Sequence, residues 1–214
     1  MQTNLKAIIF DMDGVIVDSE PWHEHAFREV FHELGYGETH GIHFPDYFGR
    51  SDRTLWVDFV AKHKPPQTLE ELAAMKQGRT VKLLRDKQPI YAGLPELLEK
   101  CAARYRLGVA SGSTHPVIKE VLALKNLRRF FSTVVSSDDV QHGKPAPDIF
   151  LRAAELLEVD HTECCVIEDS RAGVEAARAA GMNVIAITNS LPADKLVRAT
   201  RVVSNYSEIE ALLL

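Results

Sequence analysis

The sequence predicts an α/β protein, a doubly wound parallel sheet with an all-helical unit inserted after the first strand. From about residue 90 onward, short apolar strands alternate with helical stretches, which is typical of right-handed βαβ crossovers. Between residues 18 and 89, apolar residues recur at helical spacing instead, and no convincing strand is present. We therefore expect a core domain from residues 1–17 and 90–214, and a helical domain from residues 18–89.

The first strand ends in two carboxylates. Residues 5–10 are almost continuously apolar, as expected of a parallel strand covered on both faces. Asp11, Asp13 and Gly14 follow, and the glycine allows a tight turn. Since side chains alternate along a strand, Asp13 can lie beside Asp11 at the sheet edge where open α/β sheets bind ligands.

Three interpretations compete for this pair of aspartates. The first is an ordinary acidic turn. The second, a calcium loop, fails because it requires an oxygen ligand at its fifth position and glycine at its sixth, where the chain has valine and isoleucine. The third is a nucleophilic carboxylate with an acid/base partner.

The inserted unit is expected to contain three helices. The first begins at residues 18–21, with a capping side chain and a proline in its first turn. The second lies around residues 55–60, and a capping box of Thr68 and Glu71 opens the third. Because the unit leaves the core directly after the two aspartates, it can act as a lid over them.

The remaining core elements follow from the alternating pattern. We expect strands at residues 107–110, 133–135, 164–167, 184–187 and 201–203. We expect helices near residues 94–104, 115–125, 146–158, 170–180 and 207–213.

Polar residues follow three of these later strands. Ser111, Gly112 and Ser113 offer hydroxyl and N–H groups before a helix, which suits a phosphoryl group, although such residues are also ordinary in turns. Lys144 lies on a proline-stiffened loop, and taken in isolation this residue is better interpreted as a solvated surface lysine. A Walker-type loop is excluded because proline follows this lysine and the upstream glycine spacing is missing.

Glu168 and Asp169 follow the strand at residues 164–167. They could be helix-capping acids, or they could form a site for a hard cation together with Asp11. Carboxylates, hydroxyls and a lysine thus follow successive strands of one inferred sheet. If those strands lie side by side, the groups converge on one spot, and this predicts a site that handles phosphoryl groups.

Composition narrows the function further. The 214 residues carry a net charge of −5, which argues against nonspecific nucleic-acid binding. No apolar run approaches the length of a membrane span, and no signal pattern begins the chain. The three cysteines lack metal-site spacing, so we expect reduced core residues. We expect a soluble, cytoplasmic monomer that binds neither nucleic acid nor membranes.

The sequence resembles the haloacid dehalogenase superfamily, in its phosphatase branch and the group that includes β-phosphoglucomutase. Four segments carry the resemblance: residues 10–15 (FDMDGV), 110–113 (ASGS), 143–148 (GKPAPD) and 167–173 (IEDSRAG). The resemblance implies a Rossmann-like core with a helical cap inserted after the first segment. It also implies Mg²⁺ dependence and an aspartyl-phosphate intermediate, and the second aspartate points to phosphate esters as substrates.

The resemblance also implies roles for individual residues. Asp11 would attack phosphorus, and Asp13 would protonate the leaving oxygen and then deprotonate the attacking water. Lys144 would supply a fixed positive charge beside the nucleophile. Ser111 and the Gly112 N–H would hold phosphoryl oxygens.

For the metal, the resemblance implies that Mg²⁺ is bound by Asp11, Asp169 and the Asp13 carbonyl. Glu168 would contribute directly or through water.

The substrate implied is a small phosphorylated metabolite, such as a sugar phosphate. His23, Arg50, Arg53 and Ser113 are candidate substrate residues, with a core or surface role as the alternative for His23 and a solvated helix start for the arginines.

Two other functions remain open. A β-phosphoglucomutase-type isomerase would need basic residues for a second phosphate, and the matching positions here hold Asp52 and Thr114. A non-catalytic, receiver-like phospho-binding module would use neither Asp13 nor a helical cap.

Overall fold

The computed structural model describes residues 4–47 and 52–214, which form two compact units. One unit contains residues 4–18 and 89–214, and the other contains residues 19–47 and 52–88. The first unit is the α/β core and the second is entirely helical among its described residues.

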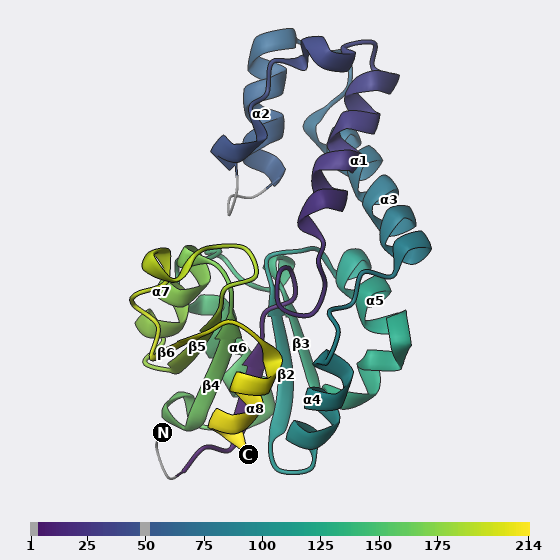
Figure 1. Cartoon of the computed structure of the whole chain (residues 1–214). Coiled ribbons are helices and arrows are strands. Elements are labelled where there is room, and N and C mark those ends of the chain that lie inside the picture. Colours follow the sequence, from purple (N-terminus) through teal and green to yellow (C-terminus); the bar gives the residue numbers. More distant parts are fainter. Residues whose placement is uncertain (1–3, 48–51) are drawn as a thin grey trace. The chain divides into compact units, whose positions relative to one another are not determined.

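The core is built on a six-stranded parallel sheet with the strand order β3-β2-β1-β4-β5-β6 (Figure 1). Its strands are β1 (Ala7–Phe10), β2 (Arg106–Ser111), β3 (Thr133–Ser136), β4 (Cys164–Glu168), β5 (Asn183–Ile187) and β6 (Arg201–Val203). Every expected strand is confirmed, and the doubly wound architecture with it. The strand order reverses at β1, and ligands bind at such switch points in open α/β sheets.

Helices of the core lie between these strands or, in the case of the last helix, follow the final strand. They are α4 (Leu94–Ala102), α5 (His115–Ala123), α6 (Asp148–Leu157), α7 (Arg171–Ala179) and α8 (Tyr206–Leu213). Short 3₁₀ segments add η3 (Leu124–Phe130), η4 (Ser137–Asp139), η5 (His161–Glu163) and η6 (Ala193–Lys195).

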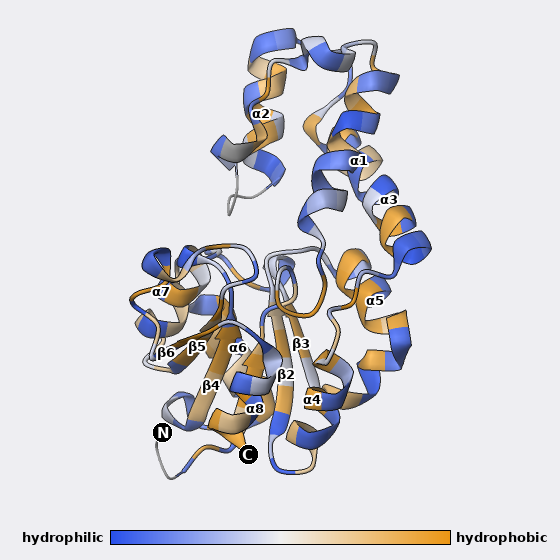
Figure 2. Ribbon diagram, in the orientation of Figure 1, coloured by the Kyte–Doolittle hydropathy of each residue, from blue (hydrophilic) through white to orange (hydrophobic). Residues whose placement is uncertain are grey.

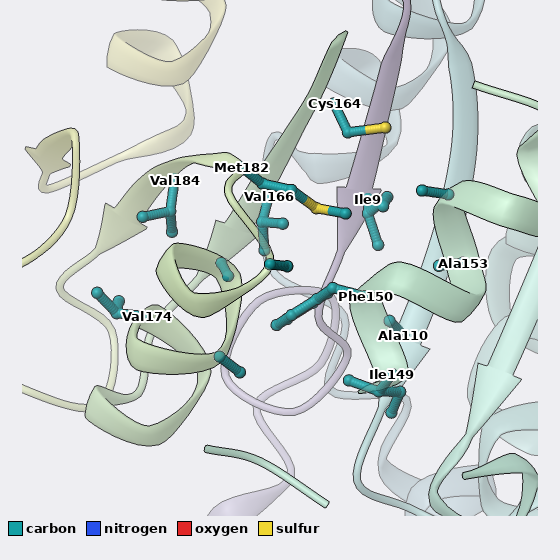
Figure 3. Close-up of a cluster of buried hydrophobic side chains, with 14 of the residues drawn as sticks. Ile9, Ala110, Ile149, Phe150, Ala153, Cys164, Val166, Val174, Met182 and Val184 are labelled. Atoms are coloured by element: carbon teal, nitrogen blue, oxygen red, sulfur yellow. The ribbon is translucent and has the colours of Figure 1, made fainter. Parts of the chain in front are cut away.

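Helices α6 and α7 cover one face of the sheet. Alternate residues of β1 and β4, such as Ile9 and Val166, point toward this face and meet Phe150 of α6 and Val174 of α7 (Figure 3). The other face packs against α4 and α8, which an ion pair between Lys100 and Glu210 joins. Because both faces are covered, the strands are hydrophobic along their length.

Most helices carry both hydrophilic and hydrophobic residues, whereas the central strands are mainly hydrophobic (Figure 2). This difference follows from burial, since a helix at the periphery has one face in solvent. Within the part of the chain that the structure describes, no helix combines the length and apolar character of a membrane span.

The helical unit contains α1 (Glu20–Glu33), α2 (Asp52–His63) and α3 (Leu69–Lys87), with 3₁₀ segments η1 (Gly37–His40) and η2 (Phe44–Tyr47). Its core is an aromatic cluster that includes Phe31 and Trp56. The capping box of Thr68 and Glu71 is confirmed at the start of α3. The expected side-chain cap of α1 is wrong: Ser19 has helical backbone angles (φ −94°, ψ −21°) rather than the extended ones that capping requires, and its hydroxyl makes no capping bond.

The three cysteines are free and buried, as expected. Burial raises the pKa of the Cys101 thiol to about 11 and that of Cys165 to about 12. Both remain protonated thiols near neutral pH, so they contribute packing rather than chemistry.

Candidate active site

The register of the sheet places Asp11 against the end of β4. Phe10 pairs with Val109 of β2 on one side and with Ile167 of β4 on the other. The Asp11 N–H continues this ladder by donating to the Ile167 carbonyl at 2.9 Å. Asp11 therefore leaves the sheet beside the Glu168–Asp169 pair, as the strand-end prediction required.

Gly14 brings the loop after β1 against Asp169. Its φ of +77° lies in the left-handed region that favours glycine, and its N–H donates to the Val17 carbonyl at 2.9 Å. A Cβ at this position would lie 1.8 Å from Asp169 Oδ2. Any side chain here would therefore displace a carboxylate of the site.

Two hydroxyls from the loop after β2 hold the Asp13 carboxylate. Ser113 Oγ donates to Asp13 Oδ2 at 2.9 Å, and the fully buried Ser111 Oγ lies 3.3 Å from the same oxygen. The Ser113 N–H donates to Ser111 Oγ at 3.0 Å. Gly112, between them, is exposed. The hydroxyl loop and the second aspartate thus come together.

Lys144 reaches the site from the edge of the sheet. It follows β3, which is separated from β1 by β2, and the loop at residues 137–147 carries it back. Its Nζ donates to Asp11 Oδ1 at 2.5 Å and to Glu168 Oε1 at 2.6 Å, and its side chain is only 13% exposed. The alternative of a solvated surface lysine is therefore wrong.

Glu168 is completely buried, and both of its oxygens have partners. Oε1 accepts from Lys144, while Oε2 accepts from the Asp169 N–H (2.8 Å), the Ser170 N–H (2.7 Å) and Ser170 Oγ (2.9 Å). A Cβ on Gly173 would lie 1.6 Å from Oε1. The start of α7 therefore packs directly on this carboxylate.

The pKa values of Asp11 and Asp169 are raised in this cluster. Burial raises the pKa of Asp11 to about 7, against the opposing charge of Lys144 and with help from the Glu168 and Asp13 carboxylates. Burial, and then the charges of Glu168 and Asp11, raise the pKa of Asp169 well above its usual range. Burial alone would lower the pKa of Lys144, but the Asp11 and Glu168 charges outweigh it and raise that pKa above its ordinary value.

The cluster has the donor chemistry of a site for a hard divalent cation. Asp11, Glu168 and Asp169 are all buried, and each offers an oxygen within 4.8 Å of the others. Three carboxylates face one lysine, so positive charge is in deficit, and oxygen donors are those that Mg²⁺ prefers. Since both Glu168 oxygens already accept hydrogen bonds, Asp11 and Asp169 are the better placed direct ligands.

The candidate substrate residues of the helical unit have mixed surroundings. His23 contacts Lys76, and Arg53 is exposed and pairs at 4.0 Å with Glu70. Arg50 lies outside the described residues.

Lys76 is a buried cation that the sequence analysis missed. It is 3% exposed, lies 2.7 Å from Asp52 Oδ2, contacts His23 and lies over the ring of Phe27. Its position in α3 could have been noticed, because it falls four residues after buried Leu72.

Asn189 and Ser190, in the loop after β5, were also missed. Ser190 Oγ donates to Asp169 Oδ2, and Asn189 Nδ2 donates to the Gly14 carbonyl at 2.8 Å. The rule that identified the other site residues, polar side chains directly after an apolar strand, applies equally to this pair.

Comparison with known proteins identifies relatives that are phosphatases, in agreement with a site that handles phosphoryl groups. The family model described as "Haloacid dehalogenase-like hydrolase" matches residues 8–187. The chain is 34% identical over 188 residues to fructose-1-phosphate phosphatase YqaB of Escherichia coli (strain K12), covering 86% of this chain and 97% of that protein. It is 31% identical over 183 residues to hexitol phosphatase B of the same organism, covering 85% and 82%.

Among solved structures, the chain resembles that of a putative β-phosphoglucomutase from Thermotoga maritima. The TM-score is 0.78 at 28% identity, and the match covers 97% of this chain and 98% of that one.

Proposed function

This chain belongs to the haloacid dehalogenase-like hydrolase family, and we propose that it is a Mg²⁺-dependent phosphatase of small phosphorylated carbohydrates. The observation that carries the proposal is the buried cluster in which Lys144 joins Asp11 to Glu168, beside Asp169. With a bound cation to balance its excess negative charge, such a cluster can hold a phosphoryl group while presenting one carboxylate as a nucleophile.

Asp11 is the nucleophile in this proposal. One of its carboxylate oxygens attacks phosphorus, the ester P–O bond breaks, and an aspartyl-phosphate forms. Lys144, held 2.5 Å from Asp11, favours the ionised carboxylate that attack requires.

Asp13 is the acid/base. It gives its proton to the leaving alkoxide, then takes a proton from the water that attacks the phosphorus of the aspartyl-phosphate. This second attack releases inorganic phosphate and regenerates the Asp11 carboxylate. The hydroxyls of Ser111 and Ser113, which contact Asp13 before substrate binds, support its orientation.

Oxygens of the phosphoryl group are held by Lys144, Ser111 and the Gly112 N–H in this proposal. These donors lie on the two loops that also hold Asp11 and Asp13. Donors fixed in advance stabilise the charge that develops in the transition state without reorganising.

Asp11, Asp169 and the Asp13 carbonyl would hold Mg²⁺, with Glu168 positioning Lys144 and joining the metal through water. When bound, the ion supplies the positive charge that lets an anionic carboxylate approach an anionic phosphate ester. The donor set supports this, since three buried carboxylates lie together and Lys144 pairs with two of them.

The substrate class rests on the relatives, whose names refer to fructose 1-phosphate and to hexitols. We propose a phosphorylated sugar or polyol as the substrate, with His23, Arg53 and Ser113 as candidates for its selection. We further propose that the protein acts in the cytoplasm as a monomer.

A mutase is the second candidate, because the chain also resembles the putative β-phosphoglucomutase structure. A mutase must hold a second phosphate away from Asp11, which calls for dedicated positive charge. Thr114 is uncharged, and Asp52 carries the wrong sign and is already paired with Lys76. Because neither position supplies a positive charge for a second phosphate, these residues favour a phosphatase over a mutase.

One experiment separates the two functions. The purified protein is incubated with Mg²⁺ and a panel of hexose and hexitol monophosphates, and inorganic phosphate is measured. β-Glucose 1-phosphate with a trace of glucose 1,6-bisphosphate is tested in parallel for glucose 6-phosphate. We expect phosphate release and no fast isomerisation. Isomerisation that is about a hundredfold faster than phosphate release would establish that the protein is a mutase. No phosphate release from any ester, including a generic aryl phosphate, would refute the proposal that the protein is a phosphatase.

A further inference from the structure

The loop after β5 reaches both segments that carry the proposed metal ligands. Thr188 fixes the start of this loop at the carboxyl ends of β5 and β6, because its N–H donates to the Val203 carbonyl of β6 at 3.0 Å. The next two residues, Asn189 and Ser190, turn their side chains back past the end of β4. One loop therefore contacts the segment after β1 and the segment after β4.

Ser190 determines how the Asp169 carboxylate is oriented. Its Oγ donates to Asp169 Oδ2, the same oxygen that lies against Gly14. A Cβ on Gly14 would come within 1.8 Å of that oxygen and 2.7 Å of Ser190 Oγ, so the three groups are packed without spare room. Holding one oxygen fixes the rotation of the carboxylate, and this sets the direction in which the second oxygen points.

Asn189 anchors the opposite segment. Its Nδ2 donates to the Gly14 carbonyl at 2.8 Å and to Tyr206 Oη at 3.2 Å. Tyr206 Oη in turn donates to the Val15 carbonyl at 2.7 Å. Two consecutive carbonyls after Asp13, those of Gly14 and Val15, are thus fixed from the loop after β5 and from α8. They restrain Gly14, whose N–H belongs to the peptide that carries the Asp13 carbonyl.

We propose that Ser190 and Asn189 are positioning residues that set the relative placement of Asp169 and the Asp13–Gly14 peptide as ligands of one cation. The inference rests on the proposed metal site and adds to it two residues that are not themselves proposed ligands. Groups that orient metal ligands in this way commonly affect metal affinity by about 10- to 100-fold when they are removed.

The test is direct metal binding to the substrate-free protein. Free Mn²⁺ is followed by electron paramagnetic resonance during titration, and Mg²⁺ affinity is obtained by competition. We expect Ser190→Ala to weaken binding by about 10- to 100-fold and Asn189→Ala to weaken it by at least threefold. The matched control is Ser204→Ala, since Ser204 Oγ also donates to a carboxylate, Glu208 Oε1 at 2.8 Å, but on an exposed turn.

The outcomes separate the inference from the function on which it rests. Circular dichroism and the melting temperature establish that each variant is folded, and Asn189→Ala remains a test if Ser190→Ala is not. Wild-type protein that binds Mn²⁺, with folded Ser190→Ala and Asn189→Ala variants within twofold of it, would overturn the inference alone. Wild-type protein that binds no Mn²⁺ would overturn the metal site and the inference together.

Discussion

Lys144 Nζ lies 2.5 Å from Asp11 Oδ1, although 133 positions separate the two residues in the chain. The same nitrogen lies 2.6 Å from Glu168 Oε1, so one buried cation joins the ends of β1 and β4. Removing it would leave two buried carboxylates without a counter-charge, and this is expensive in both stability and function.

Lys144→Gln is therefore expected to lower kcat for a phosphate ester by at least about 100-fold, since a fixed donor beside the reacting group is lost. The melting temperature at pH 8 should fall as well, because the neutral amide cannot compensate Asp11 and Glu168. Lys195→Gln is the matched control, as Lys195 is 62% exposed and pairs with neighbouring Asp194. Equal kcat for the two variants would contradict the role of Lys144.

The raised pKa of Asp11 predicts a pH dependence of stability in chelator. The folded-state pKa is about 7 against an ordinary value of 3.8, so the folded state binds the extra proton. The contribution of Asp11 to stability is therefore fully present below about pH 4 and lost as the pH rises to about 7. Thermal unfolding in EDTA should show Asp11→Asn gaining more stability over wild type at pH 8 than at pH 5.

Mg²⁺ should reverse the pH dependence of stability in the wild-type protein, because a bound cation favours the ionised carboxylates. We expect the increase in melting temperature on adding Mg²⁺ to be larger at pH 8 than at pH 5. An increase that is the same at both pH values would argue against these carboxylates as the ligands.

Gly173 and Gly78 provide a matched pair of helical glycines. A Cβ on Gly173 would lie 1.6 Å from Glu168 Oε1, whereas one on exposed Gly78 of α3 would meet nothing within 4 Å. Gly173→Ala should therefore displace the carboxylate that holds Lys144 and lower kcat by about tenfold or more. Gly78→Ala should leave kcat unchanged and stabilise the protein by up to about 1 kcal/mol. Chemical denaturation and steady-state kinetics measure both effects.

The sheet was predictable from sequence because its strands are buried on both faces and are therefore written as continuous apolar runs. The position of Asp11 beside Glu168 was predictable as well, because the carboxyl ends of parallel strands lie on the same side of the sheet. The place of Lys144 was predictable only from the combination of motifs. β3 is the edge strand, so the approach of Lys144 to Asp11 depends on a long loop whose path no local pattern encodes.

The helical unit was harder to interpret because its polar contacts are tertiary. Leu72, Lys76, Thr80 and Leu84 are the buried residues of α3, and their spacing of four is that of one helix face. A charged residue at a buried helical position needs a partner, and Asp52 lies 24 positions away on another helix. Sequence spacing could flag Lys76 as buried but could not name its partner.

Asp13→Asn should separate the two halves of the reaction when p-nitrophenyl phosphate is the substrate. This leaving group needs no proton, so Asp11 can still be phosphorylated, but the attacking water lacks its base. Rapid mixing should show a burst of about one p-nitrophenolate per active site, followed by slow turnover. A sugar phosphate should give no burst, because its alkoxide must be protonated. Wild-type steady-state rates would contradict the assignment of Asp13.

The central claim is that Asp11 is the nucleophile, and the kcat of Asp11→Asn tests it most directly. An amide cannot attack phosphorus, and removing one anion from the crowded cluster should leave the protein folded. With mass spectrometry excluding deamidation and circular dichroism confirming the fold, we predict no phosphate release above background from the best substrate of the panel. Phosphate release above about a tenth of the wild-type kcat would contradict the claim, since such a loss is far smaller than that expected for a missing nucleophile.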